Sequence, residues 1–309
     1  MTIRRLRTTD LLWYLIDGPR LGPSLAQTWD RVGKSADSPP SPRSVAGGLA
    51  LHRERERGSV LTEGLHLRAL ASVRTRSGPK AWEVHLLNLP PEIEHEGIEL
   101  LEGLCALAGE QGGERVFLRL PALNRVVDLA REAGFVRCTQ ETLYSREALP
   151  PAEQGDESAI RQLEPSDAYQ VFLLYDRCVP SRVKWEYAMT FDEWSHALES
   201  PGKRVRQGVY EVRGSVRGWA RVGSGRQSVN SLEAMMHPSE DEAAWDTLVS
   251  WALRQGRSSA PFLSLVPSHQ PEQARALERA DFVPVRQYQL MVKPLAVRVK
   301  ERAFAPARA

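Results

Sequence analysis

Apolar and polar residues follow a regular order in the C-terminal half of the chain, where three stretches of alternating character are separated by short turns rich in glycine and serine. Alternation with a period of two is typical of strands with one buried face, so these stretches predict an antiparallel meander. A stretch with apolar residues at helical spacing follows, and a buried strand, a second helix and a last strand come next. The expected ranges are 205–212, 216–222 and 229–236 for the meander and 240–255, 262–266, 272–280 and 283–292 for the later elements.

The N-terminal half repeats this order. Four pairs of segments match in sequence, and the offset between partners stays between 145 and 157 residues. Self-similarity of this kind indicates two copies of one structural unit. The pairs are 3–10 with 160–167, 68–73 with 217–222, 117–120 with 262–265 and 133–135 with 280–282. A parallel crossover joined to a meander predicts an α/β fold in each copy, a mixed sheet with helices on both faces.

The seam between the copies is a stretch at 147–158 in which proline, glycine and acidic residues cluster without an apolar period. A second stretch at 33–48, rich in proline and serine, is expected to be a long surface loop. The predicted organisation is a first domain at 1–148, a linker at 149–157, a second domain at 158–295 and a basic tail at 296–309.

Composition narrows the class of protein. The chain has 309 residues, a formal net charge of +2 and a sequence pI of about 8.5, and this charge is too mild to indicate nucleic-acid binding beyond what the tail suggests. No apolar run reaches the ~18 residues of a membrane-spanning helix. Cys105, Cys138 and Cys178 are scattered, and we expect buried thiols in a cytoplasmic protein. The histidines show no pair at metal-ligand spacing, so no metal site is expected.

Two stretches carry a resemblance to a known family. Residues 117–124 read Phe-Leu-Arg-Leu-Pro-Ala-Leu-Asn and residues 129–135 read Leu-Ala-Arg-Glu-Ala-Gly-Phe, with a weaker version of the latter at 276–282. Together with the order of elements they resemble the GNAT superfamily, the Gcn5-related N-acetyltransferases, in two tandem copies. The resemblance implies that acetyl-CoA binds between the fourth and fifth strands of a copy. It also implies direct acyl transfer to an amine, in a small molecule or at a peptide N-terminus.

The glycine-rich turn with which the family holds pyrophosphate at a helix start is missing from both copies. The second copy has Asp-Glu-Ala-Ala-Trp-Asp at 241–246, and the first has Pro-Glu-Ile-Glu-His-Glu-Gly at 91–97. Ser239 and Glu242 have the spacing of a capping box, which predicts that side chains of the chain bind the free N–H groups at the helix start of the second copy. Such a cap should stabilise the helix by about 1 kcal/mol. Carboxylates there would repel phosphate. The resemblance therefore favours weak acetyl-CoA binding in the first copy, with contacts from Leu87, Asn88, Leu89, Gly97 and Asn124.

The family often uses an acidic residue on the fourth or fifth strand as general base. Glu83, His85 and Glu233 are the titratable residues nearest that place, and a base must lie within hydrogen-bond reach of the amine. The alternative is that these side chains belong to the surface of a meander, and that Asn124 is an ordinary helix cap.

Two functions remain open. The tyrosine that the family often uses as general acid is replaced by Ala130 and Leu277 at the matching positions. The first hypothesis is a GNAT-like, acyl-CoA-dependent N-acetyltransferase with degenerate cofactor motifs. The second is a catalytically inactive binding or scaffold protein with the same fold.

Overall fold

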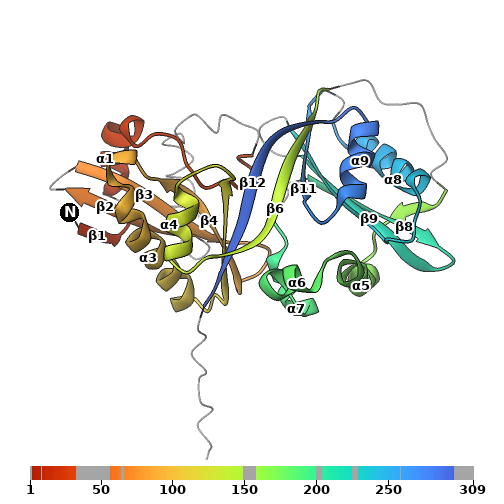
Figure 1. The fold of residues 1–309 in the computed structure, drawn as a ribbon, viewed down its shortest axis with the longest axis horizontal. Helices are drawn as coiled ribbons and strands as arrows, with labels where there is room; N and C mark the ends of the chain where they lie inside the picture. The colour runs from red at the N-terminus through yellow and green to blue at the C-terminus, as the bar shows by residue number, and fades with distance from the viewer. Residues whose placement is uncertain are drawn as a thin grey trace, which may run out of the picture.

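Figure 1 shows a computed structural model of the chain, which describes residues 2–7, 9–32, 56–63, 66–148, 158–199, 204–224, 229–257 and 259–295. The expected linker at 149–157, the loop at 33–48 and the tail at 296–309 lie outside these residues. Among the described helices, none is long and apolar enough to cross a membrane.

Twelve strands form one continuous sheet in the described part of the chain, in the order β1-β2-β3-β4-β5-β12-β6-β11-β10-β9-β8-β7. β4 pairs in parallel with β5, and β10 with β11, while the other neighbours are antiparallel. The predicted mixed sheet is confirmed. The strands are β1 Thr2–Arg5, β2 Glu56–Glu63, β3 His66–Thr75, β4 Ala81–Asn88, β5 Arg115–Pro121, β6 Val136–Arg146, β7 Ile160–Gln162, β8 Arg204–Val212, β9 Ser215–Ser224, β10 Asn230–Met236, β11 Phe262–Pro267 and β12 Val283–Pro294.

Helices cover both faces of this sheet, as the sequence predicted (Figure 1). The α-helices are α1 Asp10–Asp17, α3 Gly97–Glu110, α4 Val126–Glu132, α5 Ala168–Cys178, α6 Ser181–Tyr187, α7 Phe191–Ala197, α8 Glu242–Gln255 and α9 Pro271–Arg279, and short 3-10 helices lie at η1 Gly18–Leu21, η2 Pro91–Glu96 and η3 Pro165–Asp167.

The two copies exchange their last strands. β6 ends the first series of elements but pairs with β11, and β12 ends the second series but pairs with β5. β6 and β12 also pair with each other across the middle of the molecule (Figure 1). We call β1–β5 with β12 the first half and β7–β11 with β6 the second half. The boundaries at 148 and 158 stay a prediction about the repeat along the chain. In space, each half is completed by a strand of the other copy.

The second half has a helical layer on each face. Val222 of β9 and Ala234 of β10 pack under α8 and α9. Trp219 of β9 and Met235 of β10 point to the opposite face of the sheet, where they pack in the core cluster of α5 and α7. Because side chains alternate between the faces of a strand, Glu233 points to the same side as Met235.

One prediction about α8 is wrong. The residue that caps α8 is Asp241, whose Oδ1 accepts a hydrogen bond from the Ala244 N–H at 2.9 Å. The expected capping box of Ser239 and Glu242 is absent, because Ser239 lies in the preceding turn and its hydroxyl is 2.9 Å from Nδ1 of His237. The helix start is still satisfied from within the chain, by a carboxylate two residues later than expected.

Candidate functional site

Each half contains a pair of parallel strands that separate along their length. β4 and β5 pair only through Ala81–Glu83 and Arg115–Phe117, although β4 continues to Asn88. β10 and β11 pair only through residues 230–232 and 262–264, although both strands continue beyond. Beyond these points the facing backbone groups lack each other as partners. Buried backbone groups require hydrogen bonds, so something else has to fill each gap.

In the first half the chain fills the gap itself. The N–H of Leu25 donates to the carbonyl of Leu87 at 2.8 Å, and the N–H of Gln27 donates to the carbonyl of Arg119 at 2.9 Å. These two bonds connect residues 25–27 to β4 on one side and to β5 on the other. Ala26, between the two donors, has no exposed surface. We call residues 22–32 the inserted segment.

Two of the predicted cofactor contacts therefore bind the inserted segment. The N–H of Leu87 donates to the hydroxyl of Ser24 at 3.1 Å, in addition to the carbonyl bond above. The Asn88 side-chain amide donates to the carbonyl of Gly22 at 2.8 Å. These contacts could not be predicted from the sequence, because residues 22–32 show neither strand nor helix periodicity.

The other predicted contacts of the first copy have packing and capping roles. Leu89 is buried, and a Cβ added to Gly97 would lie 2.6 Å from Cδ2 of Leu89, so the absence of a side chain at Gly97 lets the helix approach this leucine. Oδ1 of Asn124 accepts a hydrogen bond from the N–H of Val126, at 2.8 Å, where α4 begins. Asn124 therefore satisfies an N–H at the start of α4, although the N-cap residue of this helix is Arg125.

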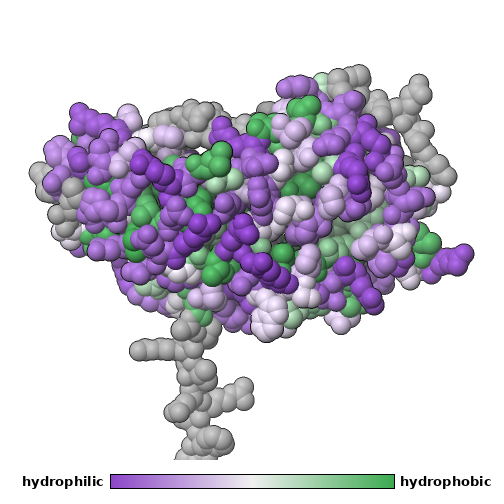
Figure 2. Space-filling model, in the orientation of Figure 1, coloured by the Kyte–Doolittle hydropathy of each residue, from purple (hydrophilic) through white to green (hydrophobic). Residues whose placement is uncertain are grey.

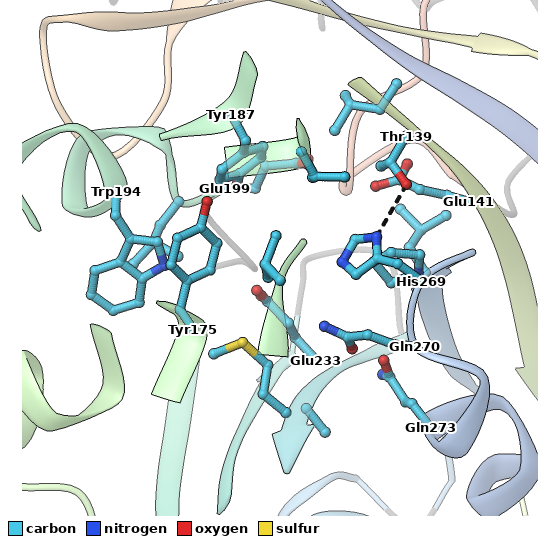
Figure 3. Close-up of a pocket in the computed structure, with 18 of the residues that line it drawn as sticks. Thr139, Glu141, Tyr175, Tyr187, Trp194, Glu199, Glu233, His269, Gln270 and Gln273 are labelled. Carbon is cyan, nitrogen blue, oxygen red and sulfur yellow. Dashed lines mark hydrogen bonds between the residues drawn. The ribbon is translucent and has the colours of Figure 1, made fainter. Parts of the chain in front are cut away.

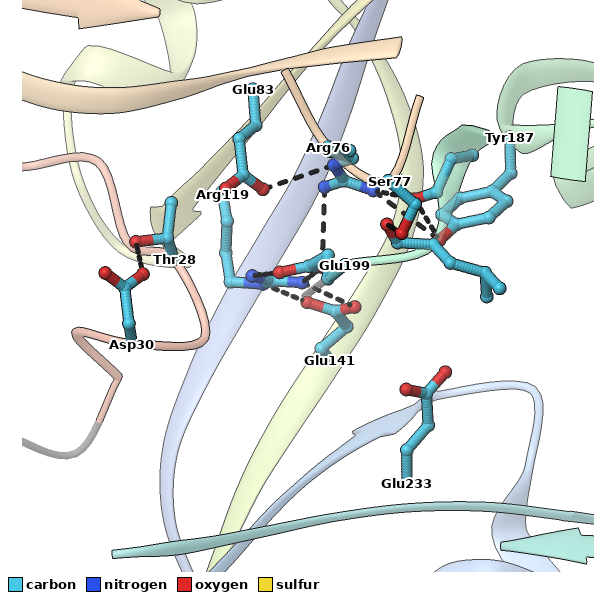
Figure 4. A network of polar contacts seen from close by, with 12 residues as sticks. Thr28, Asp30, Arg76, Ser77, Glu83, Arg119, Glu141, Tyr187, Glu199 and Glu233 are labelled. Atoms are coloured by element: carbon cyan, nitrogen blue, oxygen red, sulfur yellow. Dashed lines mark hydrogen bonds and ion pairs between the residues drawn. The ribbon is translucent and has the colours of Figure 1, made fainter. Parts of the chain in front are cut away.

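Glu83 lies within a buried network of charges rather than on a surface (Figure 4). Its carboxylate is 2.7 Å from Arg74 and 3.2 Å from Arg76, and its side chain is only 7% exposed. His85, two residues along the same strand, has Nε2 3.8 Å from Oδ2 of Asp30 in the inserted segment. The two predicted bases of the first copy thus face the chain's own charged groups.

The same network joins the two halves. Arg119 of β5 contacts Glu141 of β6 at 2.6 Å and Glu199 of the second copy at 2.5 Å. Arg76 reaches Glu199 at 3.4 Å, and its guanidinium lies 3.9 Å above the ring of Phe117. Burial alone would raise the pKa of Glu199, but Arg119 and Arg76 lower it to about 2. Glu199 is therefore ionised at neutral pH and paired with both arginines.

The gap of the second half is a pocket (Figure 3). It has room of about 110 Å³ for water-sized molecules and is bounded by Glu233, Ala234 and Met235 of β10 and by Leu265 and Pro267 of β11. Side chains from both helical layers line it, including Tyr175 and Trp194 on one side and Gln273 of α9 on the other. The pocket therefore extends from one face of the sheet toward the other between two separating strands.

Glu233 is the predicted site residue that reaches this pocket. Arg221 holds its carboxylate with two hydrogen bonds, one of them 3.1 Å long from Nε. The Arg221 side chain is 7% exposed and that of Glu233 is 31% exposed, so the carboxylate keeps an accessible side. Figure 3 shows Glu233 between Tyr175 and Trp194 on one side and His269 on the other.

His269 is a pocket residue that the sequence did not single out. It follows β11, at the carboxyl end of a parallel strand, where ligands of open α/β sheets commonly bind, and this position is the signal that could have found it. Its Nδ1 is 3.4 Å from the hydroxyl of Thr139. Desolvation lowers the pKa of His269 to about 4, so the imidazole is neutral near pH 7. Nε2 of His269 and Oε1 of Gln273 are buried and have no hydrogen-bond partner among the described residues.

Aromatic rings form the opposite wall (Figure 3). The hydroxyl of Tyr175 donates to the carbonyl of Ala188 at 2.9 Å, and that of Tyr187 donates to the carbonyl of Ala197 at 3.0 Å. Burial raises the pKa of both phenols. Trp194 lies beside Tyr175, with ring centroids 6.1 Å apart. The phenol protons are already used within the chain, so neither tyrosine is a ready proton donor.

Comparison with known proteins identifies the fold. No family model and no curated protein matches the sequence. The tandem GNAT protein from the clavulanic acid biosynthesis pathway is similar in structure, with a TM-score of 0.55 and 13% identity over 95% of this chain and 98% of that one. A GCN5-related N-acetyltransferase from Sphaerobacter thermophilus is similar with a TM-score of 0.56 and 14% identity, over 96% of this chain and 97% of that one. The chain has the tandem GNAT fold.

Saccharomyces cerevisiae N-myristoyltransferase with bound myristoyl-CoA is also similar in structure, at a TM-score of 0.50 and 11% identity over 94% of this chain and 79% of that one. These matches confirm the predicted resemblance in fold. Within the described residues, no group of three or more His, Cys, Asp or Glu side chains is arranged to hold a metal ion.

The helix start at which the resemblance implied a pyrophosphate site is closed in the second half. Asp241 occupies the N–H of Ala244, as described above. Glu240 is paired with Arg217 at 2.9 Å, and Arg279 lies 3.5 Å from Glu242. An incoming phosphate would compete with three carboxylates here, although two arginines stand beside them and become available if the pairs open.

Proposed function

We propose that the chain is an acyl-CoA-dependent N-acyltransferase whose single working site is the gap between β10 and β11. The open pocket beside Glu233 carries this proposal. The corresponding gap of the first half is filled by residues of the chain, whereas that of the second is a cavity lined by unsatisfied polar atoms of His269 and Gln273. Buried polar atoms without partners favour a ligand that supplies them.

The chemistry follows from the placement of the residues. The nitrogen lone pair of a neutral amine attacks the thioester carbonyl, the C–N bond forms, and the C–S bond breaks as the coenzyme A thiolate leaves. Glu233 accepts the proton that the amine loses, directly or through one water, and the thiolate takes a proton from solvent. Arg221 orients the Glu233 carboxylate through its hydrogen bonds. Positioning of the two substrates across the separating strands supplies the remainder of the rate enhancement.

A direct test uses the full chain, because each half needs a strand of the other copy. Acetyl-CoA is titrated calorimetrically, and we expect a dissociation constant of about 100 µM, since the start of α8 is acidic. Thiol release from acetyl-CoA is then followed with a panel of aliphatic diamines and dipeptides. Glu233→Gln should lower kcat/KM by roughly 100-fold or more and leave acetyl-CoA binding nearly unchanged, because a general base acts on the transition state.

The matched control is Glu272→Gln, an exposed glutamate at the start of α9. It should behave as the parent chain does. Full activity of Glu233→Gln would contradict the role of this carboxylate.

The closed start of α8 favours a second candidate, a GNAT-fold binding protein without catalysis. Asp241 already satisfies a helix N–H that a phosphate would need. Under this alternative, no amine in the panel accelerates thiol release even when acetyl-CoA is bound, and Glu233→Gln changes nothing.

A further inference from the structure

The inserted segment does more than fill the first gap, because it continues into the second half. Its first part lies between β4 and β5, through the backbone bonds of Leu25 and Gln27. A turn follows, in which the N–H groups of Arg31 and Val32 both donate to the carbonyl of Thr28 at 2.8 Å. Figure 1 shows this segment, in red, running from the region of α1 toward the middle of the sheet.

The turn is held by the first half. The Thr28 hydroxyl donates to Oδ1 of Asp30 at 2.7 Å (Figure 4). The same carboxylate pairs with Arg74 of β3 at 2.7 Å. Thr28 and Gln27 are almost fully buried. Side chains of the first half therefore fix both the direction and the end point of the inserted segment.

The residue placed by this turn is Trp29, which lines the pocket of the second half. Trp29 and Val32 pack in one cluster with Leu265 of β11, Leu143 of β6 and Tyr288 of β12. Leu265 is also a pocket residue. The indole thus forms a wall of the second-half pocket, although it belongs to a segment anchored in the first half.

We propose that the first half works as a holder for the inserted segment and that Trp29, so held, is the specificity-determining residue that limits which acyl chain fits between β10 and β11. The limit on acyl length rests on the proposed function, whereas the anchoring does not. In this arrangement the inserted segment, which fills the gap of the first half, also shapes the pocket of the second half.

The anchoring is tested by hydrogen–deuterium exchange of the full chain without ligand. Asn88→Ala removes the 2.8 Å bond to the carbonyl of Gly22, and Asn124→Ala removes a 2.8 Å bond at the start of α4, which serves as the matched control. Asn88→Ala should speed exchange of peptides covering residues 22–32 and 263–270 by roughly fivefold, the effect of about one hydrogen bond. Asn124→Ala should speed exchange only near α4.

Exchange of 22–32 that accelerates without any change at 263–270, or no acceleration at either, would overturn the anchoring. If Asn88→Ala does not fold, Ser24→Ala replaces it, since it removes the hydroxyl that accepts from the N–H of Leu87.

The wall is tested by competition among acetyl-, butyryl- and hexanoyl-CoA. Trp29→Ala should raise the preference for hexanoyl-CoA over acetyl-CoA by at least about tenfold, because extra methylenes then find apolar room. Trp185→Ala, which removes a tryptophan that is 69% exposed on α6, should keep the parent preference. An unchanged preference in Trp29→Ala overturns the specificity role. Failure of the parent and every variant to bind any acyl-CoA contradicts the proposed function and the acyl limit together, while the exchange measurement still decides the anchoring.

Discussion

The two gaps of this chain have the same origin and different contents. Both arise where parallel strands stop pairing after three residues, β4 from β5 and β10 from β11. The first is filled by backbone of the inserted segment, and the second is a pocket. The difference teaches that separated parallel strands leave backbone groups that require hydrogen bonds. This requirement does not by itself indicate a function. Either the chain or a ligand can meet that need.

The acidic residues beside the gaps differ in the same way. Glu83 is almost fully buried and paired with both Arg74 and Arg76. Glu233 has one arginine partner and a partly exposed carboxylate. A proton acceptor needs an accessible side, so only the second glutamate is placed to meet a substrate.

The strongest test of the comparison asks how far the halves depend on each other. Arg119→Met removes the guanidinium that joins Glu141 and Glu199 and leaves two buried carboxylates without this partner. We expect a loss of about 3–5 kcal/mol in the free energy of unfolding, measured by urea melts. Arg131→Met is the control, because its pair with Asp128 is exposed and should contribute less than about 1 kcal/mol. Equal melting of the two variants would show that the halves do not rely on this network.

A pH titration of the free energy of unfolding sharpens the comparison, because it reports on His269 in the pocket of the second half. The pKa of His269 is about 4 in the folded chain, against an ordinary value near 6.5, so the unfolded chain binds the proton more readily. The stability that the neutral imidazole contributes is complete above about pH 6.5 and is lost as the pH falls toward 4. The loss should be on the order of 2–3 kcal/mol.

His269→Gln should flatten the pH dependence of unfolding in that window. His95→Gln, at an exposed histidine of η2, should keep the slope of the parent. A parent whose stability does not change between pH 6.5 and 4 would argue against the buried, neutral state of His269.

The smallest expected effect concerns the closed start of α8. Asp241→Ala should cost about 1 kcal/mol of stability through loss of the cap, while Ser239→Ala should cost little, because the serine does not cap the helix. Asp241→Ser should restore most of the loss, since serine is also a good cap. Acetyl-CoA should bind Asp241→Ser more tightly than the parent, because one carboxylate is gone from the phosphate path. Urea melts and calorimetry measure the two effects separately.

The sequence predicted the elements well where periodicity was strong. The meander of β8, β9 and β10, the crossover partners β10 and β11, and the repeated order of elements are confirmed by the pairing. α6 was not predicted, because none of its residues is fully buried and its apolar pattern is correspondingly weak.

The pairing partners of the last strands could not be predicted from the sequence. Period-two alternation gives the face of a strand and not its neighbour, so nothing in the sequence showed that β6 joins β11 and β12 joins β5. Ser239 had the right spacing for a cap, but the turn at 237–240 shifted the helix start to Asp241. Glu83 was a reasonable candidate for the base from its place in the sequence, but tertiary contacts bring Arg74 and Arg76 against its carboxylate. Glu233 lies in the pocket, and its catalytic role remains a prediction.

The exchanged strands also set a timetable for biosynthesis. β5 is complete once residue 121 has been made, but its neighbour β12 ends at Pro294. At roughly 5–20 residues per second, the ribosome needs on the order of ten to thirty seconds to supply that strand. During this interval one edge of the nascent sheet has no permanent partner, and β6 waits similarly for β11. Such open edges bind other strands readily, so the growing chain should depend on a chaperone or on slow, late closure, and a chain truncated before residue 283 should aggregate rather than leave a folded N-terminal half.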